Sequence, residues 1–289
     1  MGGMTDVLVI GGANLDIKAK TSGPHIAATS NPAMVSVKPG GVARNIAHNL
    51  ARLGVATKLL AAVGNDAAGT TLRMATEKAG VDCALMLEVP AATGTYIAIL
   101  DEAGELVTAA NDMAIVSAIT SEVIETHKVE IAHCRFVVAD CNLSLEALLH
   151  LARLAGGKLV IEPVSVPKAT RLLALLQQSP VFLATPNLDQ IEALTGTRNP
   201  QAAIRTLQEL GLRHAVVHAG PSGAFVSHVN DVIAVPAKPA AIVDVTGAGD
   251  AATAGLIAGL LQNLPLAKAA ALGQEIAARV IASQFSTLE

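Results

Sequence analysis

Short runs of β-branched and aliphatic residues alternate along the chain with longer segments in which apolar residues recur every three or four positions. Runs of the first kind predict buried strands, and segments of the second kind predict amphipathic helices. In the first part of the chain we expect strands at 7–10, 58–63 and 84–89 and helices at 42–53 and 68–79.

The same alternation resumes after residue 135 and continues almost to the end of the chain. The expected elements are strands at 136–139, 159–161, 181–183 and 232–235 and helices at 145–154, 169–177, 248–262 and 265–282. Because strands that alternate with helices form βαβ units, this pattern predicts an α/β fold: a mainly parallel central sheet flanked by helices.

Two stretches, near 15–38 and 95–110, carry strand-like residues without an intervening helix. The second contains Asp101-Glu102-Ala103-Gly104, a sequence typical of a hairpin turn. Together they predict a small separate sheet that covers a ligand crevice as a lid. Since no repeat or linker divides the chain, we expect residues 1–289 to form one domain with this lid inserted.

Composition narrows the class of protein. Of the 289 residues, 52% are hydrophobic and only 2% aromatic, and the formal net charge is -4. An acidic chain with almost no stacking aromatics is unsuited to nucleic acid, and the apolar runs are too short to predict a membrane span. The three cysteines form no CxxC pair, and no signal-peptide pattern is recognisable, so we expect a cytoplasmic protein.

The segment Asp244-Val245-Thr246-Gly247-Ala248-Gly249-Asp250 comes after the last strand and leads into a helix of small residues. Glycines at a helix start allow consecutive backbone N–H groups to point at an anion, so Gly247, Ala248 and Gly249 predict a hole for a phosphoryl group. Asp250 then lies where a carboxylate could accept the proton of an attacking hydroxyl. The alternative is that Asp250 only caps the helix.

A second segment, 39–54, begins with Pro39-Gly40-Gly41, runs through a helix containing Asn45 and ends at Gly54. Its pattern G-G-x-x-x-N-x-A-x-x-L-x-x-L-G, together with D-x-T-G-A-G-D, resembles the two signatures of the ribokinase-like (phosphofructokinase-B type) carbohydrate kinases. The segment Gly11-Gly12-Ala13-Asn14-Leu15-Asp16 is similar to the first strand and substrate loop of that family, so the resemblance covers almost the whole chain.

The resemblance implies an enzyme that uses ATP and Mg²⁺ to phosphorylate a hydroxymethyl group of a sugar or nucleoside. It places Asp16 and Asn14 at the substrate hydroxyls, together with Gly40, Gly41 and Asn45. A carboxylate and an amide are also the groups that can pair with a vicinal diol. The alternative for Asp16 is an Asx-turn after a strand.

Further runs resemble those of the bacterial pseudouridine kinases, a branch of this family: Ser30-Asn31-Pro32, Asn111-Asp112-Met113, Ala139-Asp140-Cys141-Asn142 and Pro163-Val164-Ser165 with Lys168. This similarity implies phosphorylation of the 5′-hydroxyl of pseudouridine, with Asn111 and Asp112 on the lid beside the substrate. Asp140 could instead belong to the turn and cap before the helix at Ser144, and Lys168 could contact substrate or phosphate or be a solvated helix residue.

On the nucleotide side, Gly220-Pro221-Ser222-Gly223 is similar to the family's glycine turn near the ATP phosphates, although a hairpin turn is the commoner meaning of an isolated GxxG. Asn187 matches the start of the family's N-x-x-E motif, with Gln190 in place of the carboxylate. His218 stands where relatives usually have a hydroxyl side chain. The resemblance also assigns Gly247, Gly249 and Thr246 to the nucleotide, and Asp244 and Thr246 to a monovalent cation such as K⁺.

Other interpretations stay open at this point. The general motifs fit a kinase for another nucleoside or furanose sugar, or a sugar or nucleotide sensor without catalysis on the same fold. A dinucleotide-dependent oxidoreductase is disfavoured because the G-x-G-x-x-G spacing is absent after the first strand. The expected partners are a small-molecule nucleoside or sugar and, because lid sheets in this family sometimes pair between subunits, a second copy of the chain.

Overall fold

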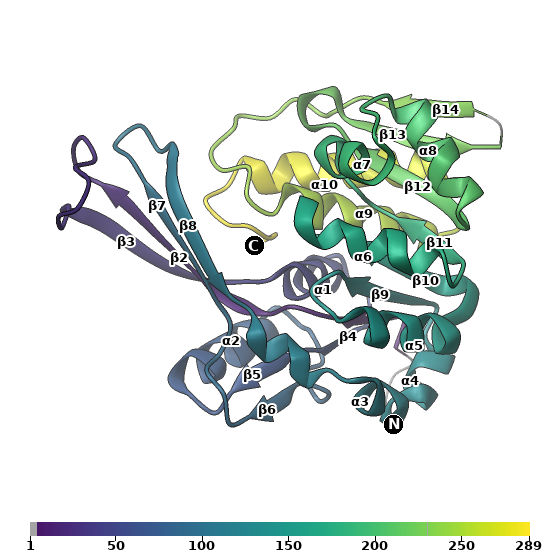
Figure 1. The fold of residues 1–289 in the computed structure, drawn as a ribbon, viewed down its shortest axis with the longest axis horizontal. Helices are drawn as coiled ribbons and strands as arrows, with labels where there is room; N and C mark the ends of the chain where they lie inside the picture. The colour runs from purple at the N-terminus through teal and green to yellow at the C-terminus, as the bar shows by residue number, and fades with distance from the viewer. Residues whose placement is uncertain (1–4, 230) are drawn as a thin grey trace.

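The computed structural model describes residues 5–229 and 231–289. Met1 to Met4 and Asn230, which belong to the predicted domain, lie outside the described residues. An eight-stranded sheet with the order β14-β13-β12-β11-β10-β9-β1-β4 forms the centre (Figure 1). Its strands are β1 (Val7–Ile10), β4 (Thr57–Leu60), β9 (Phe136–Asp140), β10 (Leu159–Glu162), β11 (Val181–Ala184), β12 (Leu212–His218), β13 (Ala224–His228) and β14 (Asp231–Val235).

All neighbouring strands from β4 to β12 pair in parallel, and only the edge pairings of β13 and β14 are antiparallel. The mainly parallel sheet expected from the sequence is therefore confirmed. The expected strand at 58–63 is divided into β4 and β5 (Ala62–Gly64), and the one at 84–89 is limited to β6 (Leu87–Val89), which pairs with β5 in a separate two-stranded sheet.

Helices cover both faces of the central sheet. The helices are α1 (Val42–Arg52), α2 (Ala67–Lys78), α3 (Ser121–Thr126), α4 (Lys128–His133), α5 (Leu145–Ala155), α6 (Val166–Leu176), α7 (Leu188–Thr195), α8 (Pro200–Glu209), α9 (Ala248–Leu261) and α10 (Leu266–Ile281). Helices α3, α4 and α8 and the short 3₁₀ turn Ala114–Ala118 were not predicted from the pattern.

Alternation along each buried strand divides the core into two layers. In β1, Leu8 and Ile10 pack with α3 to α8, whereas Val7 and Val9 pack with α1, α2, α9 and α10. Because both faces are covered, β1 and β11 are apolar at every position, as is usual for parallel sheets. Helices α1 and α9, which carry the two sequence signatures, both belong to the second layer and so lie on the same side of the sheet.

The lid is a four-stranded sheet with the order β3-β2-β7-β8 that projects from the body (Figure 1). It consists of β2 (Asn14–Thr21), β3 (Ala33–Gly40), β7 (Thr95–Leu100) and β8 (Leu106–Asp112). The predicted turn at Asp101–Gly104 joins β7 to β8, where the side chain of Asp101 accepts hydrogen bonds from the amides of Ala103 and Glu105. The prediction of a small separate sheet is thus confirmed.

Strand order also determines where a crevice forms. β1 lies between β4 and β9 in the sheet. The chain that leaves β1 continues through α1 to β4, whereas the chain that leaves β9 continues through α5 to β10, in the opposite direction along the sheet. Ligands of open α/β sheets bind at such a switch point, outside the carboxyl ends of the strands. Here the carboxyl ends of β1 and β9 carry Gly11-Gly12 and Asp140, which directs attention to this edge.

Candidate active site

Asp250 lies in the first turn of α9, and its side chain is only 8% exposed. The helix begins at Gly247, whose φ of 79° is left-handed and whose missing Cβ would lie 2.0 Å from the carbonyl oxygen of Ser286. First-turn amides have no acceptor within their own helix. The Ala248 amide donates to the Val245 carbonyl at 3.3 Å, whereas the Gly249 amide is available to an anion. The N-terminus of α9 therefore combines an anion-binding amide with a buried carboxylate.

Helix α1 supports this carboxylate from the side. The side-chain amide of Asn45 donates to Oδ2 of Asp250 at 2.8 Å, and the guanidinium of Arg44 donates to Oδ1 of Asn45 at 3.2 Å. Arg44 also contacts Thr76, His48 and the Pro39 carbonyl, so its position is fixed in several directions. Asn45, which was predicted to bind substrate, is thus placed by the structure against Asp250.

The electrostatic environment makes Asp250 a proton acceptor near neutral pH. Burial raises the pKa of Asp250 to about 7, the hydrogen bond from Asn45 opposes this rise, and the negative charges of Asp140 and Asp16 add to it. A carboxyl group with such a pKa can take up a proton and release it again close to physiological pH.

Asp16 projects from β2 beside the glycine pair that precedes α1. Its Oδ1 accepts a hydrogen bond of 2.6 Å from the side chain of Asn14, which is buried. A Cβ on Gly40 would lie 2.3 Å from Oδ2 of Asp16, and Gly41 caps α1 with a φ of 96°. The two glycines therefore make room for the carboxylate and turn the chain into α1. Burial raises the pKa of Asp16, and the Asn14 hydrogen bond opposes that rise.

Asp140 has a different environment from the one that a substrate ligand needs. Its Oδ2 accepts hydrogen bonds from the amides of Gly12 and Ala43 at 2.9 and 3.0 Å, and its Oδ1 accepts one from the amide of Asn142. The residue is 1% exposed. The structure thus uses Asp140 to hold the Gly12 loop and the start of α1 against the end of β9.

Two further predicted substrate residues lie on neighbouring elements. Lys168, in the first turn of α6, donates to Oδ1 of Asn142. Asn111 is the register partner of Tyr96, which is in turn the partner of Asp16, so Asn111 is on the Asp16 face of the lid. Asp112 is the next residue and is on the opposite face, where its side chain accepts from the amide of Ala114. The structure therefore groups Asn111, but not Asp112, with Asp16.

The predicted nucleotide residues lie at the ends of β11 and β12. Asn187 caps α7, and the side chains of Asn187 and Gln190 form a reciprocal capping box. Gln190 is 2% exposed, and its side-chain oxygen is bonded to the Asn187 amide. Glu192 pairs instead with Arg198 on the surface. The capping box accounts for the position of Gln190 without a metal. Neither Asn187 nor Gln190 has a carboxylate, and that of Glu192 is paired with Arg198.

Gly220 and Gly223 belong to the tight turn that joins β12 to β13 in an antiparallel hairpin. Both have positive φ, and a Cβ on Gly223 would lie 2.1 Å from the carbonyl oxygen of Val235. His218 precedes this turn, and its Nε2 is a buried atom without a hydrogen-bond partner among the described residues. The glycines are therefore explained by the hairpin, whereas the buried nitrogen of His218 is not.

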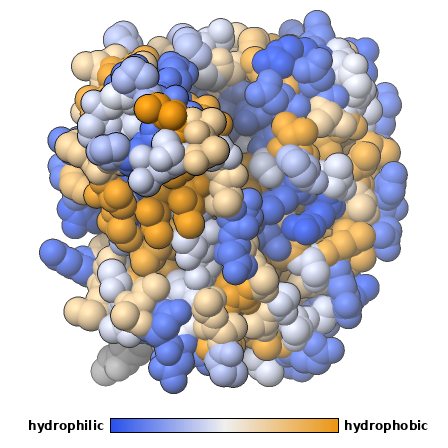
Figure 2. Space-filling model, turned by 60° about the vertical axis from the view of Figure 1, so that its left-hand side comes forward, coloured by the Kyte–Doolittle hydropathy of each residue, from blue (hydrophilic) through white to orange (hydrophobic). Residues whose placement is uncertain are grey.

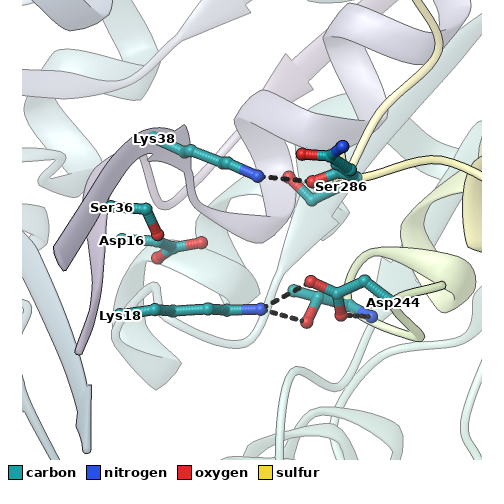
Figure 3. A pocket seen from close by; sticks show the side chains of 8 residues that line it. Asp16, Lys18, Ser36, Lys38, Asp244 and Ser286 are labelled. Carbon is teal, nitrogen blue, oxygen red and sulfur yellow. Dashed lines mark hydrogen bonds and ion pairs between the residues drawn. The ribbon is translucent and has the colours of Figure 1, made fainter. Parts of the chain in front are cut away.

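Asp244 and Thr246 lie in the loop that leads into Gly247. The Oδ1 atom of Asp244 accepts from the Thr246 amide at 2.9 Å, and Oδ2 accepts from the Lys18 ammonium at 2.8 Å. Figure 3 shows Lys18 reaching from the lid to this loop across a narrow hollow. The hollow is lined by Asp16, Lys18, Ser36, Lys38, Asp244, Thr246, Gln284 and Ser286.

Sequence reasoning did not single out Lys18 or Glu162. Lys18 could have been found from strand alternation, because it follows Asp16 by two residues and so shares its face of β2. Glu162 ends β10 beside Asp140, is 8% exposed, and accepts from the Val164 amide at 2.6 Å. Burial raises its pKa well above the ordinary value, and the charge of Asp250 contributes.

Comparisons with known proteins bear on the family and the fold of this chain. The model of the pfkB family of carbohydrate kinases matches residues 4–287. The chain is 34% identical to pseudouridine kinase from Escherichia coli, covering 97% of this chain and 91% of that protein. It is 29% identical to guanosine-inosine kinase from Exiguobacterium acetylicum, with 97% and 95% covered. In structure, it resembles ribokinase from Thermotoga maritima with a TM-score of 0.86, covering 98% and 94% at 22% identity.

Proposed function

The chain belongs to the pfkB family of carbohydrate kinases, and from this premise we propose that it transfers the γ-phosphoryl group of ATP to the 5′-hydroxyl of pseudouridine. The observation that carries this proposal is the buried Asp250 at the N-terminus of α9, held by Asn45 and with its pKa raised by burial to about 7. A phosphoryl acceptor needs a base at this place, next to amides that receive negative charge.

In the proposed reaction, Asp250 accepts the proton of the 5′-hydroxyl while the oxygen of that hydroxyl forms a bond to the γ-phosphorus. The bond between that phosphorus and the bridging oxygen of ADP breaks, and ADP leaves. The Gly249 amide and the positive end of α9 stabilise the charge on the transferred oxygens, which a helix N-terminus does without reorganising. Asp16 and Asn14 hold the ribose hydroxyls and so fix the distance between the 5′-oxygen and Asp250.

Support for a nucleoside, and for pseudouridine among nucleosides, comes from the relatives and from the lid. E. coli pseudouridine kinase is 34% identical over nearly the whole chain. Asn111 is on the same face of the lid as Asp16, where an amide could donate to and accept from the edge of a uracil ring. The similarity to guanosine-inosine kinase favours a kinase for another nucleoside as the second candidate.

ATP fits the residues that are present, because α9 offers an anion hole at its N-terminus. When bound, Mg²⁺ would neutralise phosphate charge, and in kinases it is held largely by the substrate phosphates and water. The capping box at Asn187 and Gln190 offers no free carboxylate to such an ion, so we assign no step to these two residues.

The test is release of ADP from ATP and Mg²⁺ with pseudouridine, uridine, adenosine and ribose compared in parallel. We expect a kcat/KM for pseudouridine that exceeds the other three and is lost in Asp250→Asn. Turnover of a different nucleoside or of ribose would retain the chemistry and refute the substrate. Binding of a nucleoside without any turnover would refute phosphoryl transfer and support a sensor.

A further inference from the structure

One lysine of the lid crosses the hollow and binds the loop in front of the anion hole. Lys18 Nζ lies 2.8 Å from Oδ2 of Asp244 and 2.8 Å from Oγ1 of Thr246 (Figure 3). Lys18 and Asp244 are 226 residues apart in sequence, and their side chains are only 26% and 30% exposed. The contact therefore joins two elements that are otherwise connected only through the body of the molecule.

The loop that receives Lys18 continues directly into the catalytic helix. Asp244 Oδ1 accepts from the Thr246 amide, so the carboxylate shapes the turn, and the next residue is the left-handed Gly247 that begins α9. An ammonium group bound to both side chains keeps this turn closed. Any displacement of the loop would move the start of α9 and with it the Gly249 amide, which in the proposed reaction stabilises the transferred charge.

Asp244 and Thr246 are the positions that the family resemblance gives to a monovalent cation, and the structure tests that assignment. A carboxylate and a hydroxyl suit a cation, but both already hold the ammonium of Lys18. An ammonium group carries the same charge as K⁺ and is of similar size. The side-chain part of the cation assignment therefore does not fit a free ion while Lys18 is in place.

We propose that Lys18 is a tethered monovalent cation: its ammonium group takes the place of a free K⁺ at Asp244 and Thr246, and thereby couples lid closure to the shape of the anion hole. Lys18 is a positioning residue, because it acts on the reacting phosphoryl group through the loop. The proposal rests on phosphoryl transfer at Asp250, and it does not depend on which hydroxyl compound is the acceptor.

The position of Asp16 connects this contact to substrate. Asp16 and Lys18 are two residues apart in β2 and so lie on the same face of the strand. The residue proposed to hold the ribose and the residue that holds the loop therefore move together. A second lid lysine, Lys38, donates to the carbonyl of Gln284 in the C-terminal tail and lies over the ring of Phe285. The lid is thus tied to the body at two points on either side of Asp16.

The test compares initial rates in chloride salts of K⁺, NH₄⁺ and tetramethylammonium at equal ionic strength. The wild-type protein is expected to give rates that agree within about twofold in all three salts, since its cation is covalently attached. Lys18→Met should lose at least about tenfold in tetramethylammonium and regain most of that loss in K⁺ or NH₄⁺, which can enter the vacated place.

The matched control is Lys20→Met, which removes the same charge from the same face of the same strand. Lys20 is exposed and lies two residues farther toward the lid tip. Its variant should behave like the wild-type protein in every salt. A rate change shared by both variants would show an effect of overall lid charge and would overturn the proposal.

A readout without substrate separates this proposal from the proposed function. Thermal unfolding in KCl and in tetramethylammonium chloride should give the same midpoint for the wild-type protein, whereas Lys18→Met should unfold at a higher temperature in KCl, because a bound ion stabilises the folded state. A K⁺-specific rise in the wild-type protein, or none in Lys18→Met, would contradict the tethered cation. The wild-type comparison needs no variant, so it remains decisive even if Lys18→Met folds poorly or no acceptor is turned over.

Discussion

Asp250 combines two properties that oppose each other, burial and a negative charge. Burial raises its pKa to about 7 from an ordinary value of 3.8, and the Asn45 hydrogen bond limits the rise. In the proposed reaction, the same burial makes the carboxylate basic enough to take a proton from an alcohol. The pKa of this residue is therefore the property on which both activity and part of the pH dependence of stability depend.

The first prediction concerns the pH dependence of catalysis. Because Asp250 must be ionised to accept a proton, kcat/KM should rise with pH and level off above an apparent pKa near 7. Asp250→Asn should lower kcat at least about a hundredfold, the usual scale of lost general-base catalysis. A pH-independent kcat/KM between pH 5 and 8 in the wild-type protein would contradict the role of Asp250.

The same residue gives a prediction for stability. A carboxyl group whose folded pKa is raised stabilises the fold below its unfolded pKa and loses that contribution as pH rises through the folded pKa. The free energy of unfolding of the wild-type protein, relative to Asp250→Asn, should therefore fall between about pH 4 and pH 7 and then stay constant. Urea denaturation at several pH values measures this difference. A constant difference across that window would show that Asp250 is not buried as described.

Asn45 gives a third prediction, with a matched control on the same helix. Asn45→Ala removes the hydrogen bond that favours ionised Asp250, so the midpoint of the kcat/KM profile should move to higher pH. Asn49→Ala removes a buried amide of α1 that accepts from the Leu288 amide instead. It should reduce stability and leave the midpoint unchanged. An equal shift in both variants would argue against a specific effect on Asp250.

At the scale of elements, α9 is positioned by close packing against α10. Gly255 and Gly273 face each other at the crossing, where a Cβ on Gly255 would lie 2.8 Å from the Gly273 Cα. Such contacts allow two small-residue helices to approach closely and keep the N-terminus of α9 fixed against the sheet. Helix α1 packs on the other side of α9 and brings Asn45 to Asp250.

Gly255→Val should therefore destabilise the protein by about 1–3 kcal/mol, the usual cost of overpacking a filled interface. Ala202→Val, at an exposed position of α8, is the control for adding a β-branched side chain to a helix and should cost less than about 1 kcal/mol. Chemical denaturation of the two variants gives the comparison. Equal losses would mean that the crossing of α9 and α10 has room to adjust.

Elements with regular patterns could be predicted from the sequence, and contacts between distant loops could not. The strands of the parallel sheet, α1, α9 and the lid follow from alternation, glycines and turn residues. The local sequence suggested that Asp140 forms a turn and caps the helix that follows it. In the structure, its carboxylate accepts from the Ala43 amide at the start of α1. Local sequence could not show this contact, because the two residues are 97 positions apart. The contact of Lys18 with Asp244 is more distant still, at 226 residues. β6 is shorter than expected because only three of the predicted residues pair with β5.

The alternation of side chains along β8 also explains why Asn111 and Asp112 lie on different faces of the lid, which the motif resemblance could not predict. Asn111 and Asp112 were expected together beside substrate, yet adjacent strand residues point to opposite faces. Only Asn111 shares the face of Asp16. The lesson is that a motif locates a segment, whereas the register of the sheet decides which of its side chains reaches a ligand.

At the scale of the whole molecule, the two faces of the lid differ in chemistry. One carries Asp16, Lys18 and Asn111, and the other is apolar, with Val35, Val37 and Ile97 exposed by 63%, 56% and 40%. Figure 2, in which the lid lies toward the viewer, shows hydrophobic side chains gathered there. Among the described residues, no helix is long and apolar enough to cross a membrane. A contiguous apolar face of this kind is suited to contact with a second copy of the chain.

We therefore predict a homodimer that buries the outer faces of two lids. Val37→Lys should give a monomer, because it places a charge at the centre of that face, whereas Lys20→Met on the inner face should leave the dimer intact. Light scattering coupled to size-exclusion chromatography measures both masses. A wild-type protein that is monomeric at micromolar concentration would contradict this arrangement.

In the proposed reaction, the whole molecule directs a primary hydroxyl at the γ-phosphate of ATP and excludes water from that transfer. The most direct measurement is phosphorus NMR of a completed reaction of the wild-type protein with ATP, Mg²⁺ and pseudouridine. We expect one phosphomonoester, coupled to the two 5′-protons, for each ADP formed. ADP accompanied only by inorganic phosphate, or a phosphate on a ring hydroxyl, would contradict it.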